Sequence, residues 1–283
     1  MRLSRFTFLL LLAFVILRGA AFAQQRPLVT EDPETIGAGR MLVEGGIDYG
    51  RDVFYPASGL TGNLLRAPLI GLSFGLSSIA ELQIDGGLYN HLEVTETRPA
   101  PLSDMLDYSG TSTSDVEDVV VATKIRVLSE GTSRPSLGLR FATKLPNAGN
   151  ESGLGLDTTD FFVTGLLAKT VQSVRVVGNM GLGILGDPTR GDRQNDVLMY
   201  GLSFARALTN STEVVGEVNG RAHVAGGDPP AGTESRSVLR FGARYTRGLV
   251  RVDGGILVGL TSRDPGFGVM AGATYVFNAF KVP

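Results

Sequence analysis

The feature that most constrains this chain is an alternation of apolar and charged residues along nearly its whole length. In the stretch 79–94, Glu81 and Asp85 fall on odd positions, whereas Leu82 and Ile84 fall on even ones. A period of two is typical of a β-strand whose faces meet different surroundings. The pattern predicts about twelve strands, at residues 40–52, 64–76, 79–94, 116–128, 136–145, 159–169, 174–185, 196–206, 212–223, 236–246, 249–260 and 266–277.

The connections between these segments alternate in length. Short ones are 77–78, 129–135, 170–173, 207–211 and 247–248, and the mostly longer ones are 54–63, 93–115, 146–158, 186–195, 224–235 and 261–265. Short turns on one side and long loops on the other are typical of outer-membrane barrels, whose strands cross the hydrocarbon in about 9–11 tilted residues. The sequence therefore predicts an all-β fold, a transmembrane antiparallel up-and-down β-barrel of about 12 strands with both chain ends on the short-turn side.

The N-terminus has the layout of a cleaved signal peptide. Arg2 and Arg5 precede an apolar run over 6–17, and Ala21-Phe22-Ala23 supplies small residues before a cleavage site between Ala23 and Gln24. A retained membrane helix is the alternative, but the run is short of the about 20 residues that a spanning helix needs. We expect a signal peptide at 1–23, a polar leader at 24–39 and a barrel at 40–283.

Composition narrows the function classes. Removing residues 1–23 takes away three arginines and no acid, which leaves 23 basic against 28 acidic side chains, a net charge of −5. This balance argues against nucleic acid as a partner. The chain has no cysteine, so it has neither disulfides nor thiolate chemistry. We expect location in the cell outer membrane, lipid as a partner, and neither a cofactor nor a metal.

Charged residues on the polar faces are the candidate solute-path residues. They would line the lumen and orient dipolar or anionic solutes. The alternative is a lumen closed by salt-bridged side chains, and twelve strands leave both open. The candidates are Glu44, Asp48, Glu81, Asp85, Lys124, Arg126, Arg140, Lys144, Arg175, Glu213, Glu217, Arg240 and Arg244.

The leader carries three acids, Glu31, Asp32 and Glu34, and two prolines, Pro27 and Pro33. Two interpretations stand side by side. The leader either folds into the periplasmic mouth as a plug that pairs with lumen arginines and lysines, or it is a disordered tether.

The stretch from Gly272 to Phe277 resembles the Gly-x-x-aromatic-x-aromatic signal of outer-membrane barrels. It departs from the usual form because six residues follow Phe277. The resemblance implies the barrel assembly machinery as a partner.

Four stretches, 26–41, 138–149, 155–170 and 178–189, resemble exported proteins of the family labelled MetA-pathway of phenol degradation. The resemblance runs over nearly the whole mature chain. It implies a porin-like outer-membrane transporter that passes small-molecule solutes, with aromatic compounds among the candidates, and gives no evidence of catalysis.

Other motifs point to weaker hypotheses. Gly181-x-Gly183-x-x-Gly186 matches a dinucleotide fingerprint but lies in a predicted strand with no helix after it. Asp187, Asp192 and Asp196 offer oxygen ligands for calcium without the spacing of a known loop.

Two alternatives to a channel are kept. One is a barrel enzyme that acts on lipid, with His223 as base and Ser235 or Ser237 as nucleophile, although no orienting third group is evident. The other is a soluble periplasmic β protein that binds a ligand. His91 and His223 are the only histidines, and both fall on predicted lumen faces.

Overall fold

The computed structural model describes residues 26–281, and the predicted signal peptide lies outside them. No helix in this range is long and apolar enough to span a membrane. The elements are β1 (Arg40–Tyr55), β2 (Leu60–Gly75), β3 (Ala80–Gly87), β4 (Asn90–Thr97), η1 (Ser103–Met105, a 3-10 helix), β5 (Ser112–Asp115), β6 (Val119–Leu128), β7 (Ser136–Leu145), β8 (Asp160–Val171), β9 (Val174–Gly186), β10 (Gln194–Ala207), β11 (Thr212–His223), β12 (Arg236–Arg247), β13 (Val250–Gly259) and β14 (Phe267–Asn278).

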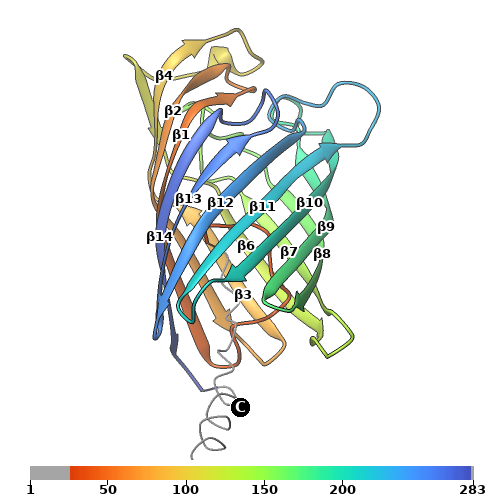
Figure 1. Cartoon of the computed structure of the whole chain (residues 1–283). Coiled ribbons are helices and arrows are strands. Elements are labelled where there is room, and N and C mark those ends of the chain that lie inside the picture. Colours follow the sequence, from red (N-terminus) through yellow and green to blue (C-terminus); the bar gives the residue numbers. More distant parts are fainter. Residues whose placement is uncertain (1–25, 282–283) are drawn as a thin grey trace, which may run out of the picture.

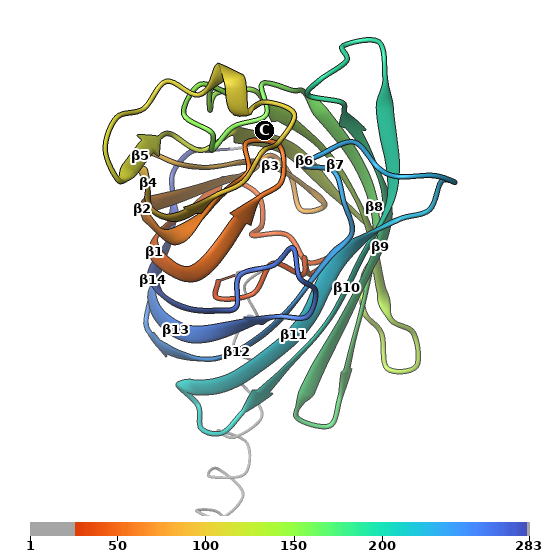
Figure 2. The ribbon, with the colours of Figure 1, turned by 90° about the horizontal axis from the view of Figure 1, so that it is seen from above.

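The sheet closes on itself through β1, which pairs antiparallel with both β14 and β2 (Figures 1 and 2). Two strands of the barrel are each made of two shorter segments, β3 with β4 and β5 with β6. The lower part of β2 pairs with β3 and its upper part with β4, while β6 pairs with β3 and β5 with β4. Fourteen segments therefore make the twelve-stranded antiparallel barrel that the alternation predicted.

The alternation of turns and loops also holds. The short turns and the C-terminal end of β14 lie at the lower rim in Figure 1, and the long loops lie at the upper rim. The first long loop is shorter than predicted, because β1 runs on to Tyr55 and β2 begins at Leu60.

The outer face is apolar. In β7, Leu137, Leu139 and Phe141 are exposed while Ser136 and Ala142 are buried inside. The segment 159–169, whose faces the sequence left unclear, has Phe161 and Val163 outside. An apolar belt on a closed barrel is suited to lipid, because pairing satisfies every strand edge.

One stretch contradicts the predicted faces. Leu92 and Val94 were expected on the apolar outer face and His91 in the lumen. Instead, Leu92 is fully buried in an interior cluster with Val53, Leu60 and Leu64, against which Val94 packs, and His91 faces outward.

The cause is a break between β3 and β4. The break runs through Leu88 and Tyr89, opposite Ala67 and Pro68 in β2, where two hydrogen bonds, Leu88 N to Pro68 O and Ala67 N to Tyr89 O, bridge the strands. At the break, both β2 and the β3–β4 segment contain one residue more than strict alternation needs. Beyond this extra residue, the side chains that would have faced outward face the lumen, and those that would have faced the lumen face outward.

We expect Leu92→Ala to lower the free energy of unfolding by about 2–5 kcal/mol, because it opens a cavity in a packed cluster. Leu88→Ala is the control, since that side chain is 61% exposed, and should cost about 1 kcal/mol or less. Urea unfolding of the two variants in lipid vesicles measures the difference, and equal losses would contradict the exchange of faces.

Candidate functional site

The described part of the leader, Arg26–Gly39, lies inside the barrel, in its lower half (Figures 1 and 2). Leu28 and Ile36 are buried, and Ile36 packs against Leu42 of β1 and Val276 of β14. Pro27 and Pro33 are buried as well, and charged and polar side chains of the wall hold the rest of the leader.

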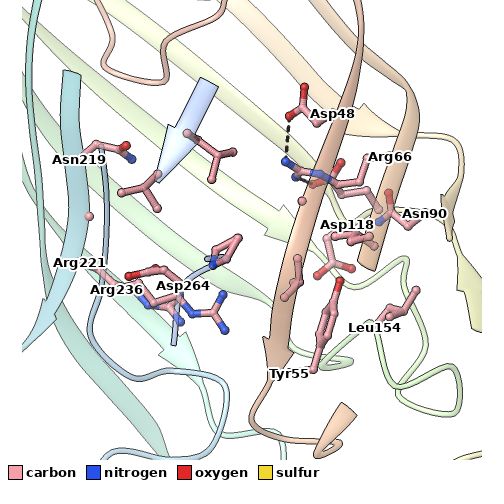
Figure 3. Close-up of a pocket in the computed structure, with 18 of the residues that line it drawn as sticks. Asp48, Tyr55, Arg66, Asn90, Asp118, Leu154, Asn219, Arg221, Arg236 and Asp264 are labelled. Atoms are coloured by element: carbon pink, nitrogen blue, oxygen red, sulfur yellow. Dashed lines mark hydrogen bonds and ion pairs between the residues drawn. The ribbon is translucent and has the colours of Figure 1, made fainter. Parts of the chain in front are cut away.

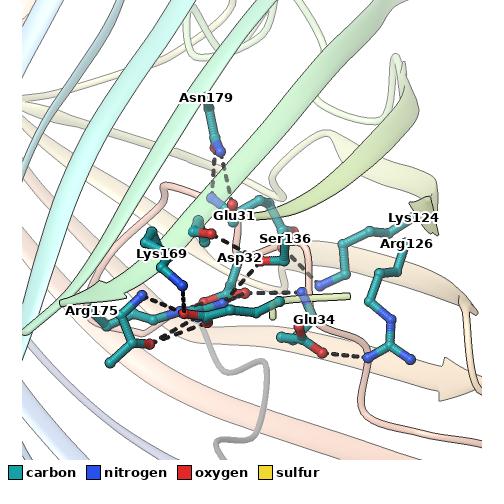
Figure 4. A network of polar contacts seen from close by, with 12 residues as sticks. Glu31, Asp32, Glu34, Lys124, Arg126, Ser136, Lys169, Arg175 and Asn179 are labelled. Carbon is teal, nitrogen blue, oxygen red and sulfur yellow. Dashed lines mark hydrogen bonds and ion pairs between the residues drawn. The ribbon is translucent and has the colours of Figure 1, made fainter. Parts of the chain in front are cut away.

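The three leader acids pair with cations of β6, β7 and β9 (Figure 4). The carboxylate of Glu31 lies 3.2 Å from Lys124 Nζ and 3.3 Å from Arg140 Nε. Asp32 accepts two hydrogen bonds from the Arg175 guanidinium, from Nε at 2.8 Å and Nη2 at 2.7 Å.

Glu34 pairs with Arg126 in the same network. Lys124 is the most enclosed cation, 1% exposed, and its Nζ also lies 2.9 Å from Glu81. Charge-assisted and bidentate contacts of this kind fix geometry as well as contribute energy.

The leader backbone is bound as well. Val29 N and Thr30 N donate to the carboxylate of Glu217 on β11, at 2.9 and 2.8 Å. The side-chain amide of Asn179 exchanges two hydrogen bonds with the backbone of Glu31. Because the leader has no strand partner here, the wall side chains satisfy its polar groups.

Arg26 anchors the leader to the opposite, acidic side. Its guanidinium lies 3.2 Å from Asp48 of β1 and 3.7 Å from Asp253 of β13, and Arg244 Nε donates to its carbonyl oxygen at 2.8 Å. A methyl group on Gly46 would lie 2.2 Å from Arg26 Cζ, so this glycine leaves room for the guanidinium. The leader thus crosses the lumen from an acidic wall to a basic one.

Eight of the candidate solute-path residues contact the leader directly. These are Asp48, Glu81, Lys124, Arg126, Arg140, Arg175, Glu217 and Arg244. The other five have partners on the wall: Glu44 with Thr274, Asp85 with Arg140, Lys144 with Asp118 and Asp160, Glu213 with Arg244 and Arg251, and Arg240 with Glu217. Every candidate thus contributes to an ionic or hydrogen-bonded contact inside the barrel.

The network continues to the short turn 129–135 through Glu130, which pairs with Arg175 and Lys169. Burial alone would raise the pKa of Glu130. The backbone N–H of Thr170 and the two cations outweigh it, so the pKa of Glu130 is lowered. The carboxylate is therefore ionised at neutral pH and ties the turn to the network.

Above the leader lies a cavity of about 540 Å³ (Figure 3). Its lining combines apolar side chains, such as Val53, Leu154 and Leu257, with charged ones. On one side Arg66 pairs with Asp48 at 2.9 Å and with Glu117 at 3.1 Å.

The sequence pattern missed several lining residues. Arg66 and Glu117 flank the strand breaks, where strict alternation fails, and Asp264 lies in a loop. Arg221 was visible as a polar-face residue of its strand but was not selected, because the pattern cannot show which cations share a cavity.

The structure brings neither histidine into a catalytic triad among the described residues. The imidazole of His223 faces Asn195 Oδ1 at 2.7 Å and the carbonyl of Gly227, while Ser235 Oγ accepts a hydrogen bond from the His223 backbone N–H. His91 Nδ1 lies 2.8 Å from Ser114 Oγ on the outer surface, with no carboxylate in contact with that pair in residues 26–281.

The remaining motifs have structural explanations. Gly181 and Gly183 lie inside β9, where a methyl group on Gly181 would lie 2.3 Å from Val163 O of the neighbouring strand. Asp187 binds its own loop through Thr189 N and Oγ1. Within residues 26–281, no three His, Asp or Glu side chains come together as a metal site.

Comparison with known proteins shows the fold. No family model and no curated protein matches the sequence. An outer membrane channel from Pseudomonas putida F1 matches with a TM-score of 0.60 and 13% identity over 87% of this chain and 98% of that one. The NanC porin matches with a TM-score of 0.49 and 10% identity over 86% of this chain and 100% of that one. The translocator domain of autotransporter NalP from Neisseria meningitidis matches with a TM-score of 0.48 and 12% identity over 85% of this chain and 89% of that one.

The first of these matches extends over nearly the whole of both chains, and its fold is the one described above. In fold, this chain is therefore an outer-membrane β-barrel. The MetA-pathway family label rests on the sequence resemblance alone.

We expect Lys124→Ala to lower the free energy of unfolding by about 3–5 kcal/mol, because it leaves Glu31 and Glu81 buried without their shared cation. Arg98→Ala is the control, since the Arg98–Glu96 pair is exposed, and should leave the free energy of unfolding nearly unchanged. Urea unfolding in vesicles gives both values. A loss no larger than the control's would show that Lys124 is not the centre of the network.

Proposed function

We propose that this chain is an outer-membrane channel for small molecules and that its leader acts as a plug at the periplasmic end of the lumen. The observation that carries the proposal is the position of the leader, inside a polar lumen and below a cavity of about 540 Å³. A solute that enters the cavity from outside then meets the leader on its way to the periplasm.

The contacts of the leader support a plug that can rearrange. They are mainly ion pairs and side-chain-to-backbone hydrogen bonds, and the buried apolar side chains of the leader are few: Pro27, Leu28, Pro33 and Ile36. Water that enters the lumen can replace polar contacts one at a time, whereas a packed apolar core separates at a much larger cost.

The lining of the cavity supports small solutes of mixed polarity. Ligand cavities of about 300–1,000 Å³ with mainly apolar walls and a few placed polar groups hold small organic molecules. The resemblance to the MetA-pathway family points in the same direction, to aromatic compounds. A soluble binding protein does not account for the apolar outer belt, and the contacts of His223 with Asn195 and Gly227 do not favour a hydrolase.

If the chain is a channel plugged by its leader, removing the leader should raise the conductance. We expect deletion of residues 25–36 to enlarge the current steps in a planar lipid bilayer several-fold, because the deletion removes Glu31, Asp32 and Glu34 from the lumen. The double variant Glu31→Gln with Asp32→Asn should give more frequent openings, since Lys124, Arg140 and Arg175 lose their leader partners.

Glu96→Gln is the control, because it removes an acid that lies exposed at the end of β4, away from the leader. It should leave the steps unchanged. Equal steps in the wild type and the deletion would disprove the plug, and silence from both, once inserted, would disprove the channel.

A further inference from the structure

Two arginines face the cavity from directly opposite positions in neighbouring strands. Arg221 of β11 and Arg236 of β12 are cross-strand partners, and both line the cavity above the leader. Figure 3 shows them grouped with Asp264 on one side of the cavity. Like charges at directly opposed positions destabilise a sheet, so the pair needs an explanation beyond stability.

In the part of the chain that the structure describes, neither guanidinium lies within 4.0 Å of a carboxylate oxygen. Arg221 donates only to backbone carbonyls, from Nε to Glu234 O at 2.8 Å and from Nη2 to Gly232 O at 2.6 Å. Arg236 donates from Nη2 to Phe54 O at 3.3 Å, and its buried Nε has no partner.

The other cations of the cavity differ in this respect. Arg66 is paired with Asp48 and Glu117, Lys144 with Asp118, and Arg240 with Glu217. The barrel therefore supplies carboxylates for the cations elsewhere in the cavity and leaves these two arginines without one.

The nearest acids have other partners. Asp264 Oδ2 accepts hydrogen bonds from Ser237 N, Thr261 N and Thr261 Oγ1, while Asp264 Oδ1 is buried without a partner. Glu234 Oε2 accepts from Gly232 N. Of these two acids only Asp264 lines the cavity, so Arg221, Arg236 and Asp264 together contribute a charge of +1 to the lining. The whole lining, five basic and four acidic side chains, gives the same balance, which one monoanion would neutralise.

The rest of the cavity favours an apolar body attached to that anion. Val53, Leu64, Leu154, Val238 and Leu257 all contribute to the lining. A guanidinium binds a carboxylate through two parallel hydrogen bonds, and such charge-assisted bonds are stronger in a partly desolvated site than in water.

We propose that Arg221 and Arg236 form a subsite for the carboxylate of a small apolar carboxylic acid, whose hydrophobic part lies against the aliphatic lining of the cavity. This inference deepens the proposed function, on which it rests, by naming the solute class that the channel selects. The plug and the subsite are separate parts: the leader contacts neither arginine through any bond described above.

The test is calorimetric titration of the detergent-folded protein with benzoate, and with benzamide as its neutral counterpart. We expect benzoate to bind more tightly than benzamide. Arg221→Gln and Arg236→Gln should each weaken benzoate binding about tenfold or more, because each removes a charge-assisted contact, and should leave benzamide binding unchanged.

Arg98→Gln is the control, since it removes an exposed arginine that does not line the cavity. Arg236→Lys, which keeps the charge but not the paired donors, should bind benzoate with intermediate affinity. Arg236→Lys also replaces the glutamine variant in the test if that variant fails to fold. Folding is checked by gel migration, which changes on heating for a folded barrel. Equal affinity for benzoate and benzamide, or unchanged benzoate affinity in the folded arginine variants, would overturn the subsite.

Conductance measured on the same samples separates the two proposals. A conducting barrel in which benzoate binds no better than benzamide overturns the subsite and leaves the channel. Arginine-dependent benzoate binding in a barrel that is silent with and without its leader overturns the channel and leaves the subsite.

Discussion

Closure of the sheet at β1 is the constraint on which the rest of the structure depends. Backbone N–H and C=O groups in hydrocarbon must be bonded within the protein, so a spanning sheet can have no free edge. The pairing of β1 with β14, from Arg40 opposite Asn278 to Arg51 opposite Phe267, and with β2 on its other side meets this requirement. Because β2 in turn pairs with both β3 and β4, the wall tolerates a break at Leu88 and Tyr89 without opening an edge.

A closed barrel with an apolar outside must gather its charges inside, where each charge needs a partner. The cations on β6, β7 and β9 are only partly matched by acids of the wall. Lys124 has Glu81, but the bidentate partner of Arg175 is Asp32 of the leader. A segment without acids in the same place would take from Arg126 its carboxylate partner and leave Lys124 and Arg175 with one carboxylate each, on Glu81 and Glu130. Buried cations that lose partners in this way destabilise the fold. The leader is therefore part of the electrostatic balance of the lower lumen and not an appendage to it.

Sequence pattern predicts most of this wall but not its exceptions. In β6 and β7 the period of two assigns the faces correctly, because Lys124 and Arg140 point inward and alternate with apolar residues that face outward. The exchange of faces after Gly87 cannot be predicted from the alternation, because leucine occurs on both faces there: Leu88 is exposed and Leu92 is buried. Pro68, which lies opposite the break, belongs to a different strand, β2. The acids of the leader suggested partners for the lumen cations, but their path across the barrel depends on contacts with five or more strands. Likewise, the sequence shows Arg221 only as one of several charged residues on the polar face of its strand. That its guanidinium binds the backbone carbonyls of Gly232 and Glu234 instead of a carboxylate depends on the path of the loop before β12, which the pattern does not predict.

The lumen thus has two levels with different electrostatic characters. In the lower level the leader neutralises the wall, and the charges there are held in mutual contacts. In the upper level, Arg221 and Arg236 oppose one another on neighbouring strands with only backbone carbonyls as acceptors. Natural sequences depart from the rules of local stability chiefly where function requires it. A cross-strand pair of like charges, kept in a cavity where every other cation has a carboxylate, is such a departure, and an anion that arrives from outside would complete it.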